Sequence, residues 1–146
     1  MFAKGTKVSI ERSQAEIQGM VTKYGATSFV SGYNGGVAII LFEAHARRVK
    51  FVLPIPQLDD VKRWKKPRLK EEALRAEHRR LWRAFALVIK AKLEAVESKV
   101  STFESEFLSQ IVDPTSGKTI GEIAIPALVG AYEHGRKMPP LLGMGT

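Results

Sequence analysis

The 146-residue sequence predicts an α+β fold in which helices cover one face of a small antiparallel sheet. Two patterns carry this prediction. Three segments between residues 27 and 54 are separated by turn signals, as strands of a meander are, and the third alternates apolar and basic residues. Apolar residues then recur at helical spacing over a long segment that begins near Lys70. With 45% hydrophobic residues, a chain of this length can bury a core without metal or disulfide.

A short strand followed by a helix is expected at the N-terminus. Residues 6–11, TKVSIE, alternate well enough for the strand. Ser13 and Glu16 match a capping box, in which the serine accepts from first-turn amides and the glutamate reaches back. Apolar residues follow at helical spacing until Gly25, which suits a helix end. A helix is therefore predicted over 14–24.

Three strands are expected next, as a meander. The segments TSFVSGY and GVAIILFEA flank Asn-Gly at 34–35, a dipeptide typical of a two-residue hairpin turn. A second reversal falls within 44–47 and leads into RVKFVLP. In this third strand Arg48 and Lys50 alternate with Val49 and Phe51, so that one face is apolar and the other partly cationic.

The remaining chain is expected to be helical. One helix runs from Lys70 to a break near 98–101, and a second covers 102–112 after the capping-box match STFE. A third follows the match TIGE at 119–122, with Pro126 kinking it or marking a later start. The predicted parts are an α/β meander (1–56), a basic proline-containing linker (57–69), a helical part packing on the sheet (70–134) and a tail (135–146), together forming one compact domain.

The positive charge is concentrated in the first two-thirds of the chain. The net charge is +8, and residues 57–100 alone contribute 13 basic and 7 acidic residues. Residues 101–146, in contrast, carry 3 basic and 5 acidic residues. Such asymmetry indicates an anionic partner, with nucleic acid first and a membrane surface second.

The predicted nucleic-acid contacts combine a basic run, an arginine-rich helix face and the cationic strand face. Guanidinium groups suit phosphate because they are planar, permanently charged and bidentate, and tryptophan rings can stack on unpaired bases. The predicted residues are Lys62, Arg63, Trp64, Lys65, Lys66, Arg68, Lys70, Arg75, Arg79, Arg83, Trp82, Arg48 and Lys50. If Phe29 or Tyr33 shares the face of Arg48 and Lys50, the sheet would resemble a stacking platform for single strands. The competing interpretation is that the charges form an ordinary solvated helix face and that Trp82 packs at the edge of the core.

No catalytic constellation is visible in the sequence. There is no cysteine, and SGKT at 116–119 lacks the glycine that a phosphate-binding loop requires, because position 112 is valine. The three histidines lie in different predicted elements without metal-ligand spacing, and His78 falls on an apolar stripe. We therefore expect a non-enzymatic protein with no cofactor and no metal site.

The expected order of helix, three-stranded meander and long helix resembles the double-stranded-RNA-binding domain, with KKPRLK near the start of the second helix, and also the β-β-β-α core of phage single-strand annealing proteins. In texture, ERSQAEIQGMVTKYGATSFVSG and AYEHGRKMPPLL look like small phage or prophage proteins. These resemblances carry over no functional residue. They imply a cytoplasmic protein that serves phage DNA metabolism or counters a host system.

The leading hypothesis is a nucleic-acid-binding protein of phage type that favours single-stranded DNA and acts in replication or recombination. The alternative is a protein-interaction module, either an assembly subunit or a small inhibitor of a host defence complex, with an incidental basic surface. Self-association through the apolar C-terminal segments IAIPALVGAY and MPPLLGM is compatible with both. The longest apolar run, VAIILF, is far shorter than the ~20 residues of a membrane span, so no membrane partner is expected.

Overall fold

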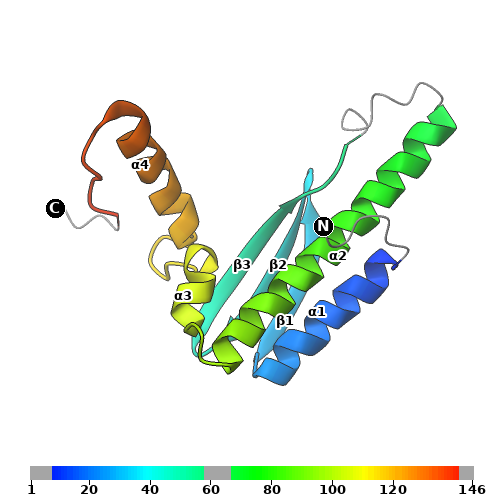
Figure 1. The fold of residues 1–146 in the computed structure, drawn as a ribbon, viewed down its shortest axis with the longest axis horizontal. Helices are drawn as coiled ribbons and strands as arrows, with labels where there is room; N and C mark the ends of the chain where they lie inside the picture. Colours follow the sequence, from blue (N-terminus) through cyan, green and yellow to red (C-terminus); the bar gives the residue numbers. More distant parts are fainter. Residues whose placement is uncertain (1–7, 58–66, 142–146) are drawn as a thin grey trace.

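The computed structural model describes residues 8–57 and 67–141 (Figure 1). It confirms the predicted α+β class. Along the chain the elements are α1 (Ile10–Tyr24), β1 (Ser28–Asn34), β2 (Val37–Ala44), β3 (Arg47–Pro54), α2 (Pro67–Glu97), α3 (Phe103–Phe107), the short 3₁₀ helix η2 (Leu108–Gln110) and α4 (Ile120–His134). Pro67 opens α2 at the position where the missing N–H of proline costs no hydrogen bond.

The three strands form one antiparallel sheet in the order β1-β2-β3. The β1–β2 turn lies at Gly35 and Gly36, one residue later than predicted, because Asn34 still pairs with Val37. Gly35 has φ +65°, a conformation that glycine adopts without strain. The predicted second reversal is confirmed, since β2 and β3 are joined by His45 and Ala46, both with positive φ.

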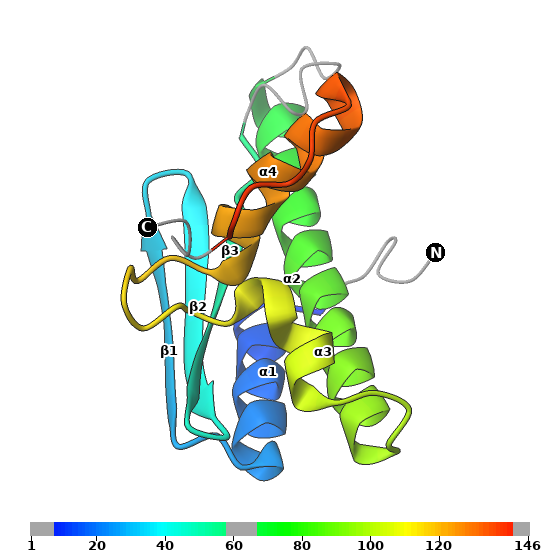
Figure 2. The ribbon, with the colours of Figure 1, turned by 90° about the vertical axis from the view of Figure 1, so that its left-hand side faces the viewer.

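The helices α1 and α2 lie side by side and parallel on one face of the sheet (Figures 1 and 2). Between them and the sheet lies a core of apolar side chains. Its fully buried large residues are Ile17, Val21, Ile40, Phe42, Val49, Trp82, Ile89 and Phe107. The other face of the sheet carries no described helix (Figure 2).

The predicted N-terminal strand is wrong over the described residues, because α1 begins at Ile10 and Ser9 caps it by accepting from the Arg12 amide. The predicted cap, Ser13, is instead buried within the helix. Glu16 does not complete a capping box but reaches across to α2. Both serines satisfy the local rules for a cap, and packing of α1 on α2 selects the earlier one.

The C-terminal elements lie beyond the β3 edge of the sheet (Figure 1). Residues 111–112 attach them there, since the Val112 amide donates to the Arg48 carbonyl at 2.9 Å. The cap of α3 is Thr102, one residue after the predicted Ser101. The capping box of Thr119 and Glu122 is confirmed, and α4 continues through Pro126.

Candidate nucleic-acid interface

The positive charge of α2 lies entirely in its N-terminal half. Residues 67–83 contain six basic and three acidic residues, whereas residues 84–97 contain two of each. The N-terminal end of a helix also carries a partial positive charge from its backbone amides. This half of α2 is therefore the part of the helix best suited to an anion.

Two arginines of this half are engaged within the protein. Arg83 of α2 forms an ion pair with Glu16 of α1, and both of its terminal nitrogens donate to that carboxylate. Arg80 forms an ion pair with Glu77 on the same helix at 3.0 Å. Arg83 thus joins the two helices, so the prediction that it contacts phosphate loses its main physical basis.

Arg75 and Arg79 form no ion pair or hydrogen bond with the described residues. Because α1 and α2 are parallel and Glu16 meets Arg83, the residues one turn earlier, Arg12 and Arg79, lie at the same level of the two helices. Arg12 is exposed, and its side chain likewise has no described partner. We call Arg12, Arg75 and Arg79 the basic surface. Sequence reasoning missed Arg12 because it started the helix after that residue, although Ser9 was an available cap.

Tyr33 is an exposed aromatic residue at the same level of the helices. Its side chain is 57% exposed, its hydroxyl is 3.5 Å from the amide nitrogen of Gln14, and its ring meets the edge of the His78 ring at 6.4 Å. Burial lowers the pKa of His78, and the Nε2 atom of that ring is buried with no hydrogen-bond partner. Tyr33 therefore contacts Gln14 of α1 and His78 of α2, which are two residues from Arg12 and one residue from Arg79 along the chain.

The predicted stacking role of Trp82 is wrong, because its side chain is 1% exposed and packs against Phe85 in the core. The buried stripe of α2 also includes Ala86 and Leu93, which lie further round the helix than the predicted apolar stripe. This rotation arises because α2 packs against both the sheet and α1, and only the first of these contacts was anticipated.

The predicted stacking platform on the sheet is also absent. Lys50 pairs with Leu41, on the face opposite to Ala38 and Phe42. Phe29 and Tyr33 pair with Phe42 and Ala38, so they lie on the helix-covered face. Arg48 and Lys50 do share the uncovered face as expected, but Arg48 lies 4.0 Å from Glu43 there.

The remaining predicted contacts fall into two groups. Lys62, Arg63, Trp64, Lys65 and Lys66 lie outside the described residues, as does the side chain of Arg68. Lys70 is described and lies in the first turns of α2, about 140° around the helix from Arg75 at 100° per residue. It is therefore not part of the basic surface.

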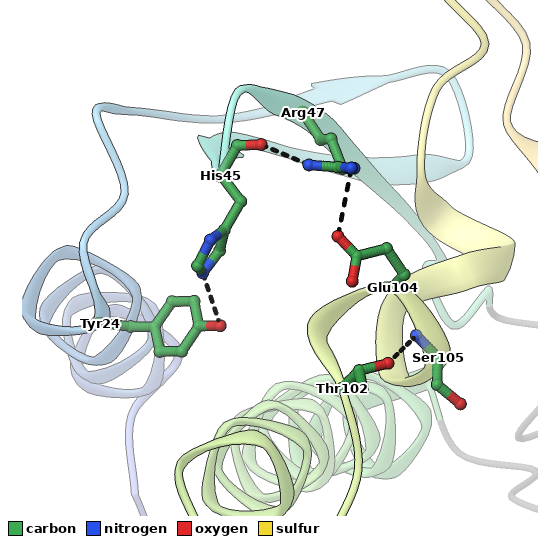
Figure 3. A network of polar contacts seen from close by, with 6 residues as sticks. All are labelled: Tyr24, His45, Arg47, Thr102, Glu104 and Ser105. Carbon is green, nitrogen blue, oxygen red and sulfur yellow. Dashed lines mark hydrogen bonds and ion pairs between the residues drawn. The ribbon is translucent and has the colours of Figure 1, made fainter. Parts of the chain in front are cut away.

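A polar network closes the opposite end of the molecule (Figure 3). The Tyr24 hydroxyl and His45 Nε2 are 3.0 Å apart, and Arg47 donates to the His45 carbonyl at 2.7 Å while its other nitrogen meets Glu104 at 3.3 Å. Burial raises the pKa of Tyr24, and the negative charges of Glu104 and Glu97 raise it further. The phenol is therefore held protonated, which suits a structural hydrogen bond tying the β2–β3 turn to α1 and not a nucleophile.

No protein-family model, curated protein or solved structure matches the chain. Among residues 8–57 and 67–141, no helix is long and apolar enough to cross a membrane, and no group of three His, Cys, Asp or Glu side chains could hold a metal ion. The function is therefore inferred from the geometry of the described surfaces.

Proposed function

We propose that the protein is a non-enzymatic nucleic-acid-binding protein that grips single-stranded DNA through the basic surface. The observation that carries this proposal is that Arg12 of α1 and Arg79 of α2 lie at the same level of two parallel helices, with Arg75 one turn before Arg79, and that none of the three has an acidic partner among the described residues. Three unpaired guanidinium groups on adjacent helices suit a run of phosphates.

Tyr33 supports the preference for a single strand. Unpaired bases stack on aromatic rings at ~1–3 kcal/mol per base, whereas duplex bases are already stacked on each other. Tyr33 is an exposed ring at the same level of the helices as the basic surface, and Trp64, which lies outside the described residues, comes just before α2 in the sequence. The role in phage DNA replication or recombination remains part of the proposal and rests on the sequence alone.

Binding of a fluorescent oligonucleotide over a range of salt concentrations tests the basic surface. Each phosphate contact contributes about −0.7 to the slope of log affinity against log salt on single strands. Replacing Arg12, Arg75 and Arg79 together by alanine should therefore flatten the slope by about 2. A slope that stays unchanged would remove the basic surface from the binding site.

A matched control separates a local contact from a general charge effect. Lys23 and Lys90 lie at the other end of the same helices beside Glu94 and Glu97, and Lys118 lies in the turn before α4. Replacing Lys23, Lys90 and Lys118 by alanine removes the same charge, and the slope should change little. An equal loss in both triple variants would mean that net charge alone attracts the nucleic acid.

Single substitutions of the aromatic residues test the strand preference. Tyr33→Ala should weaken binding of a single strand about 5- to 150-fold, which corresponds to ~1–3 kcal/mol, while binding to a duplex of equal length changes little. Trp64→Ala tests the second ring in the same way. If both variants bind both substrates as the wild type does, the protein recognises the backbone only.

A further inference from the structure

The helix α4 presents a continuous apolar stripe to solvent. Ile125, Leu128, Val129 and Tyr132 are spaced as i, i+3, i+4 and i+7, which places them on one face of the helix. Their exposed fractions are 52%, 43%, 44% and 85%. We call these four residues the α4 stripe. A stripe with this spacing is the usual core-facing side of an amphipathic helix, yet here no described element covers it.

The other side of α4 is covered by the C-terminal chain. Residues 135–141 run back along the helix (Figure 2), and the Arg136 guanidinium lies 3.2 Å from the point where a side chain on Gly130 would begin. Ala127, Gly130 and Ala131 line a cavity between the helix and this segment, together with Arg136 and Pro139. The tail therefore lies over the small-residue face and leaves the α4 stripe open.

The uncovered face of the sheet also carries a cluster of apolar side chains, beside Glu43, Arg48 and Lys50. Alternate residues of the three strands point to it, and we call its apolar set the open sheet face. Its members are Val30, Val37, Ile39, Leu41 and Val52. Val30 is 59% and Val52 is 48% exposed, while the three residues of the central strand are half-buried. A solvated sheet face is normally polar, so this composition indicates that the face is covered in the working protein.

The two apolar surfaces meet at one groove. A cavity of about 410 Å³ lies between β3 and the start of α4, lined by Lys50 and Val52 on one side and Gly121, Glu122 and Ile125 on the other. From there α4 leans away from the sheet (Figure 1). Ile125 of the α4 stripe and Val52 of the open sheet face line opposite sides of this cavity, so the two surfaces meet at a groove between β3 and the start of α4.

We propose that the occupant of this groove is a second copy of the chain, with α4 of each copy lying on the open sheet face of the other. In a two-fold dimer each contact occurs twice, so one association covers both apolar surfaces on both copies. Packing of a helix on a sheet is also an arrangement that suits both an apolar helix stripe and an apolar sheet face.

The charges beside the two surfaces are complementary. The carboxylates of α4 are Glu122 and Glu133. On the open sheet face Arg48 and Glu43 offset each other, which leaves Lys50 in excess. The hydrogen bond from the Thr119 backbone amide lowers the pKa of Glu122, and the positive charge of Lys50 in the same copy lowers it further. An acidic helix on a slightly basic sheet face favours this pairing over contact between two sheet faces.

Sedimentation of the full chain tests the dimer. The wild type should run at twice its 16.2 kDa mass. Leu128→Asp on the α4 stripe and, separately, Val30→Asp on the open sheet face should each give monomers with unchanged circular dichroism. Val100→Asp is the matched control, because Val100 is 83% exposed outside both surfaces and its loss should leave a dimer. A monomeric wild type, or variants that stay dimeric, would overturn the proposal.

Crosslinking shows which surfaces meet. The chain contains no cysteine, so Leu128→Cys combined with Val30→Cys creates the only two thiols. In one chain they lie far apart, since α4 stands beyond β3 and Val30 is on β1 at the other edge. A short thiol crosslinker should give covalent dimers on a denaturing gel. Crosslinking within single chains would mean that α4 folds onto its own sheet, and no crosslinking of a dimer would place the interface elsewhere.

Discussion

Replacing Arg83 by alanine should destabilise the protein while leaving its affinity for nucleic acid almost unchanged. Arg83 is directed to Glu16 of α1 and is only 20% exposed, and the Glu16 side chain is 35% exposed. Removal of the Arg83 side chain leaves the half-buried Glu16 carboxylate without its cation where the two helices meet. The cost therefore falls on the packing of α1 against α2.

The size of the effect follows from the burial of the pair. An exposed ion pair contributes ~0.2–1 kcal/mol, and breaking a fully buried pair costs ~3–5 kcal/mol. The Glu16–Arg83 pair lies between these limits, so we expect a loss of about 1–2 kcal/mol in the free energy of unfolding. For a chain of this size that corresponds to a fall in Tm of roughly 3–8 °C.

Urea denaturation of Arg83→Ala, Glu16→Ala and the double variant measures the pair directly. The double variant should be more stable than the sum of the single losses predicts, with a coupling energy of about 1 kcal/mol. The salt dependence of oligonucleotide binding for Arg83→Ala should match the wild type, whereas Arg79→Ala should flatten it by about 0.7. Unchanged stability together with a flatter salt slope for Arg83→Ala would refute the reasoning and return Arg83 to the interface.

Four further substitutions test the stability of the protein and its dependence on pH. Gly19→Ala should raise the free energy of unfolding by ~0.5–1 kcal/mol, because alanine favours the helix and nothing lies near the new Cβ. Gly121→Ala should lower the free energy of unfolding by ~1–3 kcal/mol, because the new Cβ would be 2.9 Å from the Ser109 carbonyl oxygen. Ala46→Gly should raise it by up to about 1 kcal/mol, since Ala46 has φ +59° and pays the left-handed strain that glycine avoids. These three values come from urea denaturation, and a change of opposite sign in any of them contradicts the local geometry. Burial lowers the pKa of His78, so on acidification below pH ~6.5 the unfolded chain protonates this histidine before the folded chain does. The free energy of unfolding of the wild type should therefore fall from pH 7 toward pH 5. This fall should be smaller in His78→Asn.

The sequence allowed the fold class to be predicted because its determinants are local. Short strand-like segments separated by turn residues mark the strands, and the capping box at Thr119 marks the start of α4 through contacts within one turn. The start of α1 was misplaced because Ser9 and Ser13 both satisfy the local rule. Their roles are decided by burial of Ser13, which depends on packing in the folded protein.

The site was less predictable because it depends on which surfaces meet. Glu16 and Arg83 are 67 residues apart in the sequence, and no local sequence pattern predicts their ion pair. Trp82 is buried because α1 packs beside α2. The spacing of apolar residues within α2 alone does not predict that contact. The face occupied by Tyr33, however, was predictable from the sequence. Two-residue turns in both hairpins already place Tyr33 and Lys50 on opposite faces of the sheet.

An NMR titration of the ¹⁵N-labelled protein with a single-stranded oligonucleotide locates the nucleic-acid contacts residue by residue. We expect amide and arginine side-chain resonances to shift at Arg12, Arg75 and Arg79 and at Tyr33, while those around Lys23 and Lys90 stay in place. Shifts confined to Arg48 and Lys50 on the sheet, or no shift anywhere at physiological salt, would contradict the proposed interface.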